Sequence, residues 1–562
     1  MTDLAKTLSL SFDKRLAAAP ILEQKRYRAE RLLDALSWKS ALDSSFPPII
    51  CLVGGTGTGK STVFNSLAGH KISEVGTRRP STLKAVILVS QAFAAQFESA
   101  PLVQRSGESC AIVFPHQHPE LMDLVLVDTP DFDSVELSNR TISDGFFTIS
   151  DILVFITSQE KYADLTGQDM QTLAHQWGKA TVFVMNKVVS DTAYNDFKRL
   201  LSGAGYKNDP IRIERLGTSP DLIPGLRDRP EFSELLARAG GKSGATIRNE
   251  ELRRLHDRTL ASLDDLINAV EFQVQRIATV NREIGRILAE VSKGMETQLD
   301  AIVSDEVEVK IRDRLQRLLR KYDILFLPRM MVRNAIRNLF KTVVEVFVSG
   351  GIGSADGDNE KDIRTEDFEA TRALVRLQPL EWAVSKLNLA IAEVLSSNPA
   401  LEDLCQIAAT DVPRWSAQQI RSHYDAAFPG MEHLLEAEFN RLRDGLSRTD
   451  EFKLYGSYTL WAFFLITAEI VVGGGFTLLD AVLNTVIVPF IPKWLLNLKV
   501  LDVLREIGER VDREHRNTLR GILQEQAELY TERFSKLVPT EAVLERFRVL
   551  EENLVAHGRV PA

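Results

Sequence analysis

The sequence predicts an α/β domain with a mostly parallel sheet, followed by a long α-helical bundle. Between residues 47 and 242, short apolar runs alternate with helix-length segments, a pattern typical of parallel strands with helices on both faces. From residue 243 onward the strand-like runs stop, and apolar residues recur every three or four positions, as in amphipathic helices. A third observation is a glycine-rich stretch directly after the first apolar run, which indicates a tight loop between a strand and a helix.

The composition is that of a folded protein without a general affinity for nucleic acid. Hydrophobic residues make up 44% of the 562 residues and charged residues 26%, which excludes a mostly disordered chain and a polytopic membrane protein. Lys and Arg total 68 against 77 Asp and Glu, so the formal net charge is −9 and no nucleic-acid partner is expected. The three cysteines, Cys51, Cys110 and Cys405, are too few and scattered for a disulfide framework and favour a reducing cytosol. The first residues contain no long apolar segment, so no secretory signal is expected.

Residues 1–46 are expected to form a helical segment that packs on the helical bundle. Leu, Ala and charged residues recur at helical spacing up to about Leu36. The stretch Ser-Ser-Phe-Pro-Pro, residues 44–48, then ends the pattern because Ser and Pro favour turns.

Apolar runs in residues 47–242 are expected to form the strands of the sheet. The first, Ile-Ile-Cys-Leu-Val, is β-branched and ends in glycines, as a buried strand entering a tight loop does. A last strand is expected near residues 211–216. The intervening runs are residues 83–90, 124–128, 152–157 and 181–186.

A phosphate-binding loop follows the first strand. Residues 54–61 match G-x-x-x-x-G-K-[ST] and lie between a strand and a helix, where this motif occurs. Backbone N–H groups of such a loop surround phosphate oxygens, and the helix N-terminus adds its dipole. Lys60 is expected to reach the β and γ phosphates, and the Ser61 hydroxyl to bind Mg²⁺. The expected nucleotide-binding residues here are Gly54, Gly55, Thr56, Gly57, Thr58, Gly59, Lys60, Ser61 and Thr62.

Further polar residues follow later strands and are expected at the same edge of the sheet. Asp128 closes the run 124–128 and would hold the Mg²⁺ shell through water. Asn186 and Lys187 end another strand, where the amide would reach a purine and the lysine stem would pack over the loop. Thr218 and Ser219 would complete the base pocket.

These motifs resemble the GTPases of the translation-factor-related class over residues 48–220. The helix sequence KSTVFNSLAG is similar to that of small ribosome-assembly GTPases, whereas VGG-x-x-x-GKS and Thr-Arg-Arg-Pro at 77–80 resemble the dynamin family. The resemblance implies a P-loop GTPase fold with GTP, GDP and Mg²⁺ as ligands. Its switch I threonine would be Thr77 by the dynamin alignment and Thr82 by the ribosome-assembly spacing; we favour Thr82. The residues expected to carry catalysis are Lys60, Thr82 and Asp128, with Ser61, Thr82 and Asp128 around the metal.

Several positions depart from these families. Asp131 stands where the D-x-x-G motif has glycine, and it adds a carboxylate that a phosphate would repel at short range. Thr56 and Gly57 replace the Gln and Ser of dynamins, so the dynamin mechanism is not implied. Val189 stands where an Asp normally recognises guanine, and Asp191, two residues later, would do so only from a bulged loop. Guanine is favoured over adenine.

The remaining residues are expected to form a helical stalk, 243–453, an apolar hairpin, 454–498, and a returning C-terminal helix, 499–562. Three glycines at 473–475 split the hairpin into arms at the lower limit for crossing a bilayer. Glu469 and Asp480 flank this turn, which favours shallow insertion over a full crossing. The alternative is a hairpin buried in a soluble bundle. A basic stripe, Arg329, Arg333, Arg337 and Lys341, fits either anionic lipid or a solvated helix face.

The order of segments is similar to that of bacterial dynamin-like proteins and mitofusins. This resemblance implies a GTPase that couples its nucleotide state to a helical stalk, self-associates, and acts in the cytoplasm at the membrane face. Membrane lipid is the expected partner of residues 454–498. Two alternatives remain: a soluble regulatory GTPase acting on a protein or ribosomal partner, and a nucleotide-binding scaffold with negligible turnover, which Asp131 and the missing Gln suggest.

Overall fold

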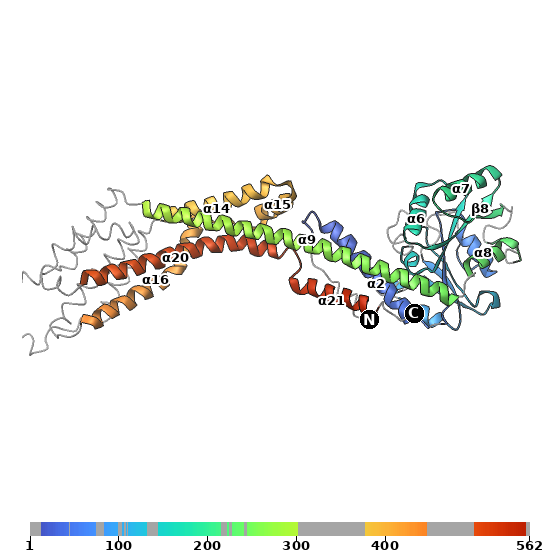
Figure 1. Ribbon diagram of the computed structural model, residues 1–562, viewed down its shortest axis with the longest axis horizontal. Helices are drawn as coiled ribbons and strands as arrows, with labels where there is room; N and C mark the ends of the chain where they lie inside the picture. Colours follow the sequence, from blue (N-terminus) through green and yellow to red (C-terminus); the bar gives the residue numbers. More distant parts are fainter. Residues whose placement is uncertain are drawn as a thin grey trace, which may run out of the picture. The chain divides into compact units, whose positions relative to one another are not determined.

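The chain forms two compact units, which are described separately (Figure 1). Unit 1 comprises residues 1–274 and 539–562, and unit 2 comprises residues 275–538. The computed structural model describes residues 13–43, 45–74, 84–98, 100, 104–105, 108–109, 111–131, 144–214, 222–223, 228–240, 244–301, 377–446 and 500–557. Five features predicted from the sequence lie outside these ranges: Thr77, Thr82, the Thr218–Ser219 pair, the basic stripe at 329–341 and the apolar hairpin at 454–498.

Unit 1 contains a mostly parallel sheet, which confirms the predicted fold class. Within the described residues, seven strands lie in the order β5-β2-β6-β1-β7-β8-β9. Neighbouring strands are parallel except β2 and β6, which are antiparallel. The strands are β1 (Ile49–Val53), β2 (Ala85–Ser90), β5 (Ala111–His116), β6 (Val125–Asp128), β7 (Ile152–Ser158), β8 (Ala180–Val188) and β9 (Ile211–Glu214).

The sequence pattern missed three of the strands. β5 is an edge strand with a half-exposed surface, and it contains Pro115, so it lacks the continuous apolar run that marks a central strand. β3 (Gln104–Arg105) and β4 (Glu108–Ser109) pair as a separate two-residue ribbon, too short for any periodicity.

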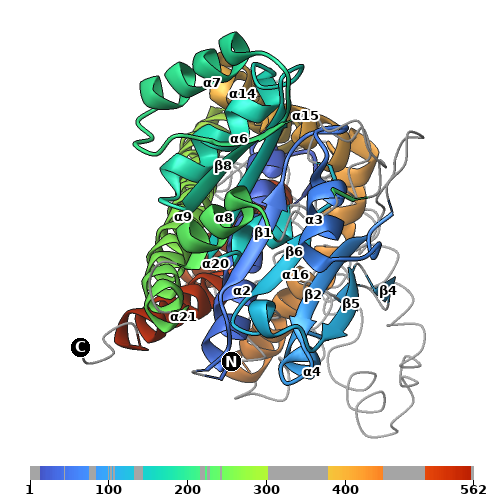
Figure 2. The same ribbon diagram turned by 90° about the vertical axis from the view of Figure 1, so that its right-hand side faces the viewer.

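Helices cover both faces of the sheet (Figure 2). Alternate residues of β1 point to opposite faces, so Cys51 joins one apolar cluster and Leu52 the other. The Leu52 face is covered by α3 (Lys60–Ala68) and α8 (Pro230–Gly240). The helices that contribute to the Cys51 face are α2 (Ala19–Ala41), α4 (Ala94–Glu98), α6 (Leu165–Gln176), α7 (Asp191–Gly203), the first part of α9 (Gly244–Ala301) and α21 (Glu541–His557).

Two terminal segments have features that the prediction did not include. The buried residues of α2, such as Leu32 and Trp38, share one core with the sheet as well as with the first part of α9, where Asp265 pairs with Lys25 of α2 at 2.5 Å. The single returning helix expected over 499–562 is two helices, α20 (Val500–Ser535) and α21. Pro539 lies between them and lacks the N–H that a continuous helix requires. α20 belongs to unit 2, whereas α21 belongs to unit 1.

Unit 2 is entirely helical in its described residues, as predicted. It contains the later part of α9 with α14 (Gln378–Ser397), α15 (Glu402–Asp411), α16 (Ala417–Leu446) and α20. Two buried hydrogen bonds join its helices: Tyr530 donates to Asn388 at 2.9 Å, and the Tyr424 hydroxyl lies 3.2 Å from His515 Nδ1. Among the described residues, no helix has both the length and the apolar content needed to cross a bilayer.

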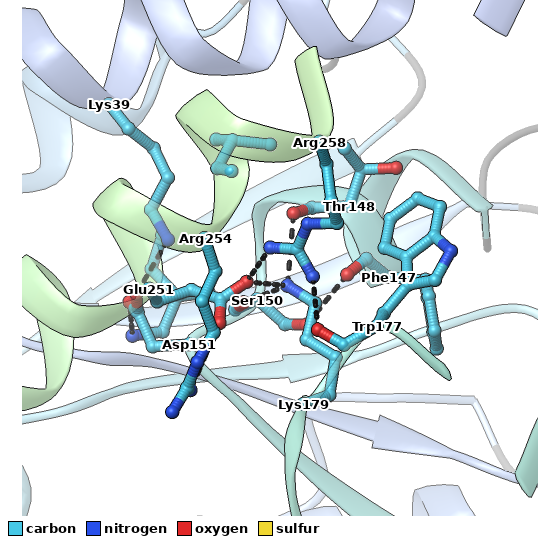
Figure 3. A network of polar contacts seen from close by, with 12 residues as sticks. Lys39, Phe147, Thr148, Ser150, Asp151, Trp177, Lys179, Glu251, Arg254 and Arg258 are labelled. Carbon is cyan, nitrogen blue, oxygen red and sulfur yellow. Dashed lines mark hydrogen bonds and ion pairs between the residues drawn. The ribbon is translucent and has the colours of Figure 1, made fainter. Parts of the chain in front are cut away.

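A buried ion pair in unit 1 joins α2 to the sheet (Figure 3). Lys39 Nζ of α2 lies 2.5 Å from Asp151 Oδ1, and both side chains are at most 1% exposed. Asp151 immediately precedes β7, and its second carboxylate oxygen accepts a hydrogen bond from the backbone N–H of Ile49, 2.8 Å away. One carboxylate therefore positions the end of α2 and the start of β1 together.

A neighbouring set of charges joins α9 to the sheet (Figure 3). Lys179, immediately before β8, donates to the carbonyls of Thr148 and Ser150 at 3.1 and 2.5 Å. Its ammonium also lies 2.7 Å from Glu251 of α9. Arg258, further along α9, contacts the same Glu251 carboxylate and donates to the Trp177 carbonyl at 2.7 Å. Because buried charges are costly unless they are paired, these contacts fix the position of the first turns of α9 against the sheet.

Glu251→Gln should destabilise unit 1 at neutral pH. Burial opposes ionisation, but Lys179 and Arg258 outweigh it and hold the pKa of Glu251 below its usual value of 4.5. Removing the charge leaves two buried cations short of a partner, at a cost of about 3–5 kcal/mol. A group with a lowered pKa stabilises the fold above its unfolded pKa, and this contribution is lost as the pH falls through the folded value. The difference in free energy of unfolding between the wild type and the variant should therefore shrink below pH 4.5.

Urea unfolding of the full chain at pH 7 and at pH 4 or below measures this effect. The matched control is Glu283→Gln, which removes an exposed ion pair with Arg286 and should change stability little. Equal effects of the two substitutions at pH 7 would contradict the role assigned to the buried network.

Candidate nucleotide-binding site

The glycine-rich loop has the close packing that its glycines permit. It runs from the end of β1 at Val53 to the start of α3 at Lys60. A Cβ atom on Gly54 would lie 2.3 Å from the carbonyl oxygen of Ile156 in β7. Gly57 and Gly59 have φ angles of +78° and +95°, which side chains other than hydrogen rarely allow.

Two residues at the end of β8 hold this loop from the side. The Asn186 amide donates to the carbonyl oxygen of Thr58 at 3.1 Å, and Lys187 Nζ donates to that of Gly57 at 2.8 Å. Lys187 has φ +58° and is the only non-glycine residue with positive φ among those described. Its backbone N–H donates to the Asn186 side-chain oxygen at 2.9 Å. This arrangement turns the lysine stem back over the loop, where the sequence pattern predicts it.

Lys60 is buried in the loop and already has three oxygen partners. Its ammonium donates to the carbonyls of Gly54 and Gly55, at 2.9 and 3.5 Å, and contacts the carboxylate of Asp131. The side chain is 5% exposed. Of the neighbouring loop and helix residues, Thr56, Ser61 and Thr62 are partly exposed, whereas Thr58 is buried with its hydroxyl 2.8 Å from the Gly55 carbonyl.

Asp128 lies at the carboxyl end of β6 and has an unused oxygen. Its Oδ2 accepts a hydrogen bond from Ser73 Oγ at 2.7 Å, while its fully buried Oδ1 accepts none from the described residues. Burial raises the pKa of Asp128, and the charge of Lys60 opposes this shift. A buried carboxylate oxygen and the Ser61 hydroxyl, on neighbouring elements, are the kind of oxygen donors that Mg²⁺ and its water shell prefer. The residues present therefore fit this metal.

Asp191, the residue predicted to recognise guanine, has a different partner in the structure. Asp191 is the first residue of α7, its side chain is 78% exposed, and its carboxylate pairs with Arg212 of β9. The register of β8 with β9 shifts between Met185 and Val188, and the chain then passes through Ser190, the N-cap, into α7. Val189 is 68% exposed.

Three contacts at the site were not predicted from the sequence. Ser73 binds Asp128, Asp131 binds Lys60, and Gln159 Oε1 accepts the backbone N–H groups of Val189 and Ser190 at 3.0 and 2.9 Å. Each joins residues far apart in the chain, and no motif spacing relates the two partners to each other. The shared edge itself follows from strand register, because Asp128 pairs with Leu52 of β1, and Asn186 with Ser158 of β7.

The comparisons with known proteins identify the domain that carries this site. The model of a family described as 50S ribosome-binding GTPase matches residues 49–187. This range contains the loop, Asp128, Asn186 and Lys187, and the sheet that holds them. Residues 49–187 therefore form a P-loop GTPase domain, as the sequence motifs predict.

One curated relative and two solved structures are also similar to this chain. A probable transmembrane GTPase FZO-like, chloroplastic, from Arabidopsis thaliana is 27% identical over 197 residues, which cover 35% of this chain and 20% of that protein. Two solved structures of an oligomerised bacterial dynamin pair, described in the context of sensing and tethering membranes, align with 99% of this chain and 97% and 95% of theirs. Their TM-scores are 0.40 and 0.35, at 13% and 14% identity. The family match over residues 49–187 confirms the predicted resemblance to P-loop GTPases.

Gly59→Ala should damage nucleotide binding far more than Gly57→Ala. Both positions have positive φ, so both substitutions introduce backbone strain of about 1–3 kcal/mol. At Gly59 the new Cβ would also lie 2.4 Å from the Asn186 amide, whereas at Gly57 it meets nothing within 4 Å. We expect affinity for a fluorescent GTP analogue to be roughly tenfold or more weaker in Gly59→Ala than in Gly57→Ala. Equal losses would show that the Asn186 contact does not hold the loop.

Proposed function

We propose that the protein binds GTP at residues 54–62 and hydrolyses it to GDP and phosphate with the help of Mg²⁺. The observation that carries this proposal is the loop geometry: a glycine-rich loop held by Asn186 and Lys187, within the segment that matches a GTPase family. The loop N–H groups and the α3 N-terminus would bind the β and γ phosphates.

Each polar residue of the site has a separate part in this proposal. Lys60 would neutralise charge that develops on the transferred phosphoryl group, a contribution made mainly by positioned cations and dipoles. The Ser61 hydroxyl and the unused oxygen of Asp128 would hold Mg²⁺, the latter through water, and Thr82 would join them in the triphosphate state. Bound Mg²⁺ would supply charge neutralisation of the phosphate oxygens. Thr218 and Ser219 remain the proposed edge of the base pocket.

We propose GTP rather than ATP as the ligand because residues 49–187 match a GTPase family. The position of Asp191 gives this preference no support, since its carboxylate is paired with Arg212 on the surface. We also propose self-association, as in the dynamin-like proteins that the sequence resembles, so that a second copy would contribute to the catalytic surroundings.

Lys60→Ala should abolish GTP turnover without unfolding the domain. Loss of one charge-stabilising group commonly lowers turnover by about 10²–10³-fold. Phosphate release from GTP and from ATP is measured for the wild type, for Lys60→Ala and for Lys198→Ala, an exposed surface lysine in the same unit that serves as control. We expect GTP to be preferred and only Lys60→Ala to be inactive. Phosphate release that does not exceed the Lys60→Ala background would instead favour the nucleotide-binding scaffold.

We further propose that the GTPase domain works at a membrane, on its cytoplasmic face, and that its nucleotide state controls the helical stalk. Two facts support this: the apolar sequence of residues 454–498, and the similarity to a relative whose name describes a transmembrane GTPase. The division into a helical stalk, 243–453, and a returning segment, 499–562, is part of the same proposal. The competing function is a soluble regulatory GTPase that acts on a protein or ribosomal partner.

The wild type should float with liposomes, and the double variant Phe463→Asp with Phe464→Asp should not. Transfer of large apolar side chains into lipid contributes about 1.5–3 kcal/mol for each one fully buried, and this contribution survives high salt. Binding through the basic stripe at 329–341 would instead fade as salt shortens the Debye length. Flotation at low and high salt, with GTP affinity measured in parallel, separates these cases. A wild type that never floats, and a double variant that melts at much lower temperature, would favour the soluble regulatory GTPase.

A further inference from the structure

Lys60, the lysine expected to bind phosphate, is paired with a carboxylate, that of Asp131. Its carboxylate pairs with the Lys60 ammonium, and the two side chains are 15% and 5% exposed. Asp131 stands at the position where the D-x-x-G motif of related GTPases has a glycine. The pair therefore depends on a residue that departs from the family pattern and lies inside the proposed nucleotide site.

The contact uses the last donor of Lys60. An ammonium group has three N–H donors, and here two point to the carbonyls of Gly54 and Gly55 while the third points to Asp131. A phosphate oxygen can approach this ammonium at hydrogen-bond distance only after one partner has left. The two carbonyls belong to the loop backbone, whereas Asp131 contributes a side chain, so Asp131 is the partner that can leave.

The backbone just before Asp131 is firmly held. Thr129 donates its hydroxyl hydrogen to the carbonyl of Leu52 in β1 at 2.9 Å, and Asp128 is fully buried with its carboxylate bound to Ser73. These contacts keep the chain up to residue 129 in place. Release of Lys60 therefore requires movement of the Asp131 side chain and its immediate backbone, rather than displacement of β6.

We propose that Asp131 acts as an internal competitor of the nucleotide phosphates: it neutralises Lys60 in the empty site and must be displaced when nucleotide binds. This inference rests on the proposed function. In the displaced state its carboxylate remains close to phosphate oxygens of the same sign, which adds repulsion. Both effects weaken nucleotide binding. The affinity for nucleotide is therefore lower than it would be with glycine at position 131.

The competition makes two measurable properties change together. A residue that stabilises only the empty protein lowers affinity for the ligand by the same factor, because binding must overcome that stabilisation. Asp131→Asn should therefore lower the melting temperature of the nucleotide-free protein and raise its affinity for nucleotide. A residue with a merely structural role would lower the melting temperature with and without nucleotide, and would not tighten binding.

The test compares Asp131→Asn and Asp131→Gly with the wild type, using a non-hydrolysable GTP analogue and Mg²⁺. Asp164→Asn is the control, because its carboxylate forms an exposed pair with Lys161 in the same unit. We expect both Asp131 variants to bind the analogue roughly tenfold more tightly than the wild type does. At saturating analogue their melting temperatures should equal or exceed that of the wild type. In a Lys60→Ala background, Asp131→Asn should no longer lower the melting temperature of the empty protein.

The outcomes separate this inference from the function on which it rests. Equal or weaker analogue binding by both Asp131 variants, with the wild type still binding, would overturn the competition alone. Absence of binding by the wild type and by both variants would overturn the proposed function and this inference together. Binding by the Asp131 variants but not by the wild type would support both.

Discussion

The structure of unit 1 depends on the pairing of buried charges at the amino-terminal edge of its sheet. Lys39, Asp151, Lys179 and Glu251 are all at most 1% exposed as side chains, and none would be stable there alone. Lys39 comes from α2, Glu251 from α9, and the other two immediately precede β7 and β8. These charges are paired only when α2 and α9 both lie against the edge where β7 and β8 begin. The ion pairs therefore position the helices that cover the Cys51 face of the sheet.

The strand β1 connects this network to the nucleotide site. At its start, the Ile49 N–H is bound by Asp151, and at its end Val53 leads directly into the glycine-rich loop. The strand is buried along its whole length and lies between β6 and β7. The positions of the phosphate loop and of α2 are thus both tied to β1, whereas α9 is joined to the start of β8 through Glu251 and Lys179.

The site at the other end of β1 has its own charge balance. Carbonyl oxygens and the Asp131 carboxylate surround Lys60, and one buried oxygen of Asp128 accepts no hydrogen bond from the part of the chain that the structure describes. The pairing of Lys60 with oxygen atoms suits a site without phosphate. The available oxygen of Asp128 suits a metal ion that binds together with the nucleotide. Asn186 and Lys187 hold the loop through its backbone carbonyls, so their contacts do not depend on the charges of Lys60 or Asp128. The loop is therefore preorganised, while the charges within it must rearrange.

The sequence by itself determined those features that local patterns encode. The alternation of apolar runs and helix-length segments predicted the parallel sheet, and the spacing of Gly54, Gly59 and Lys60 predicted the phosphate loop, because both depend on residues close together in the chain. Strand order then placed Asp128 and Asn186 at the loop, as parallel strands end at one edge.

Only the tertiary structure decided the contacts between distant segments. It assigned α2 to the core of the sheet, divided 499–562 at Pro539, engaged Asp191 with Arg212, and joined Asp131 to Lys60. Residues in such pairs lie far apart along the chain, and their identities alone do not specify which of many charged or apolar groups they meet. Packing and burial make that choice, because a charge removed from water must find the partner that the completed fold brings within reach.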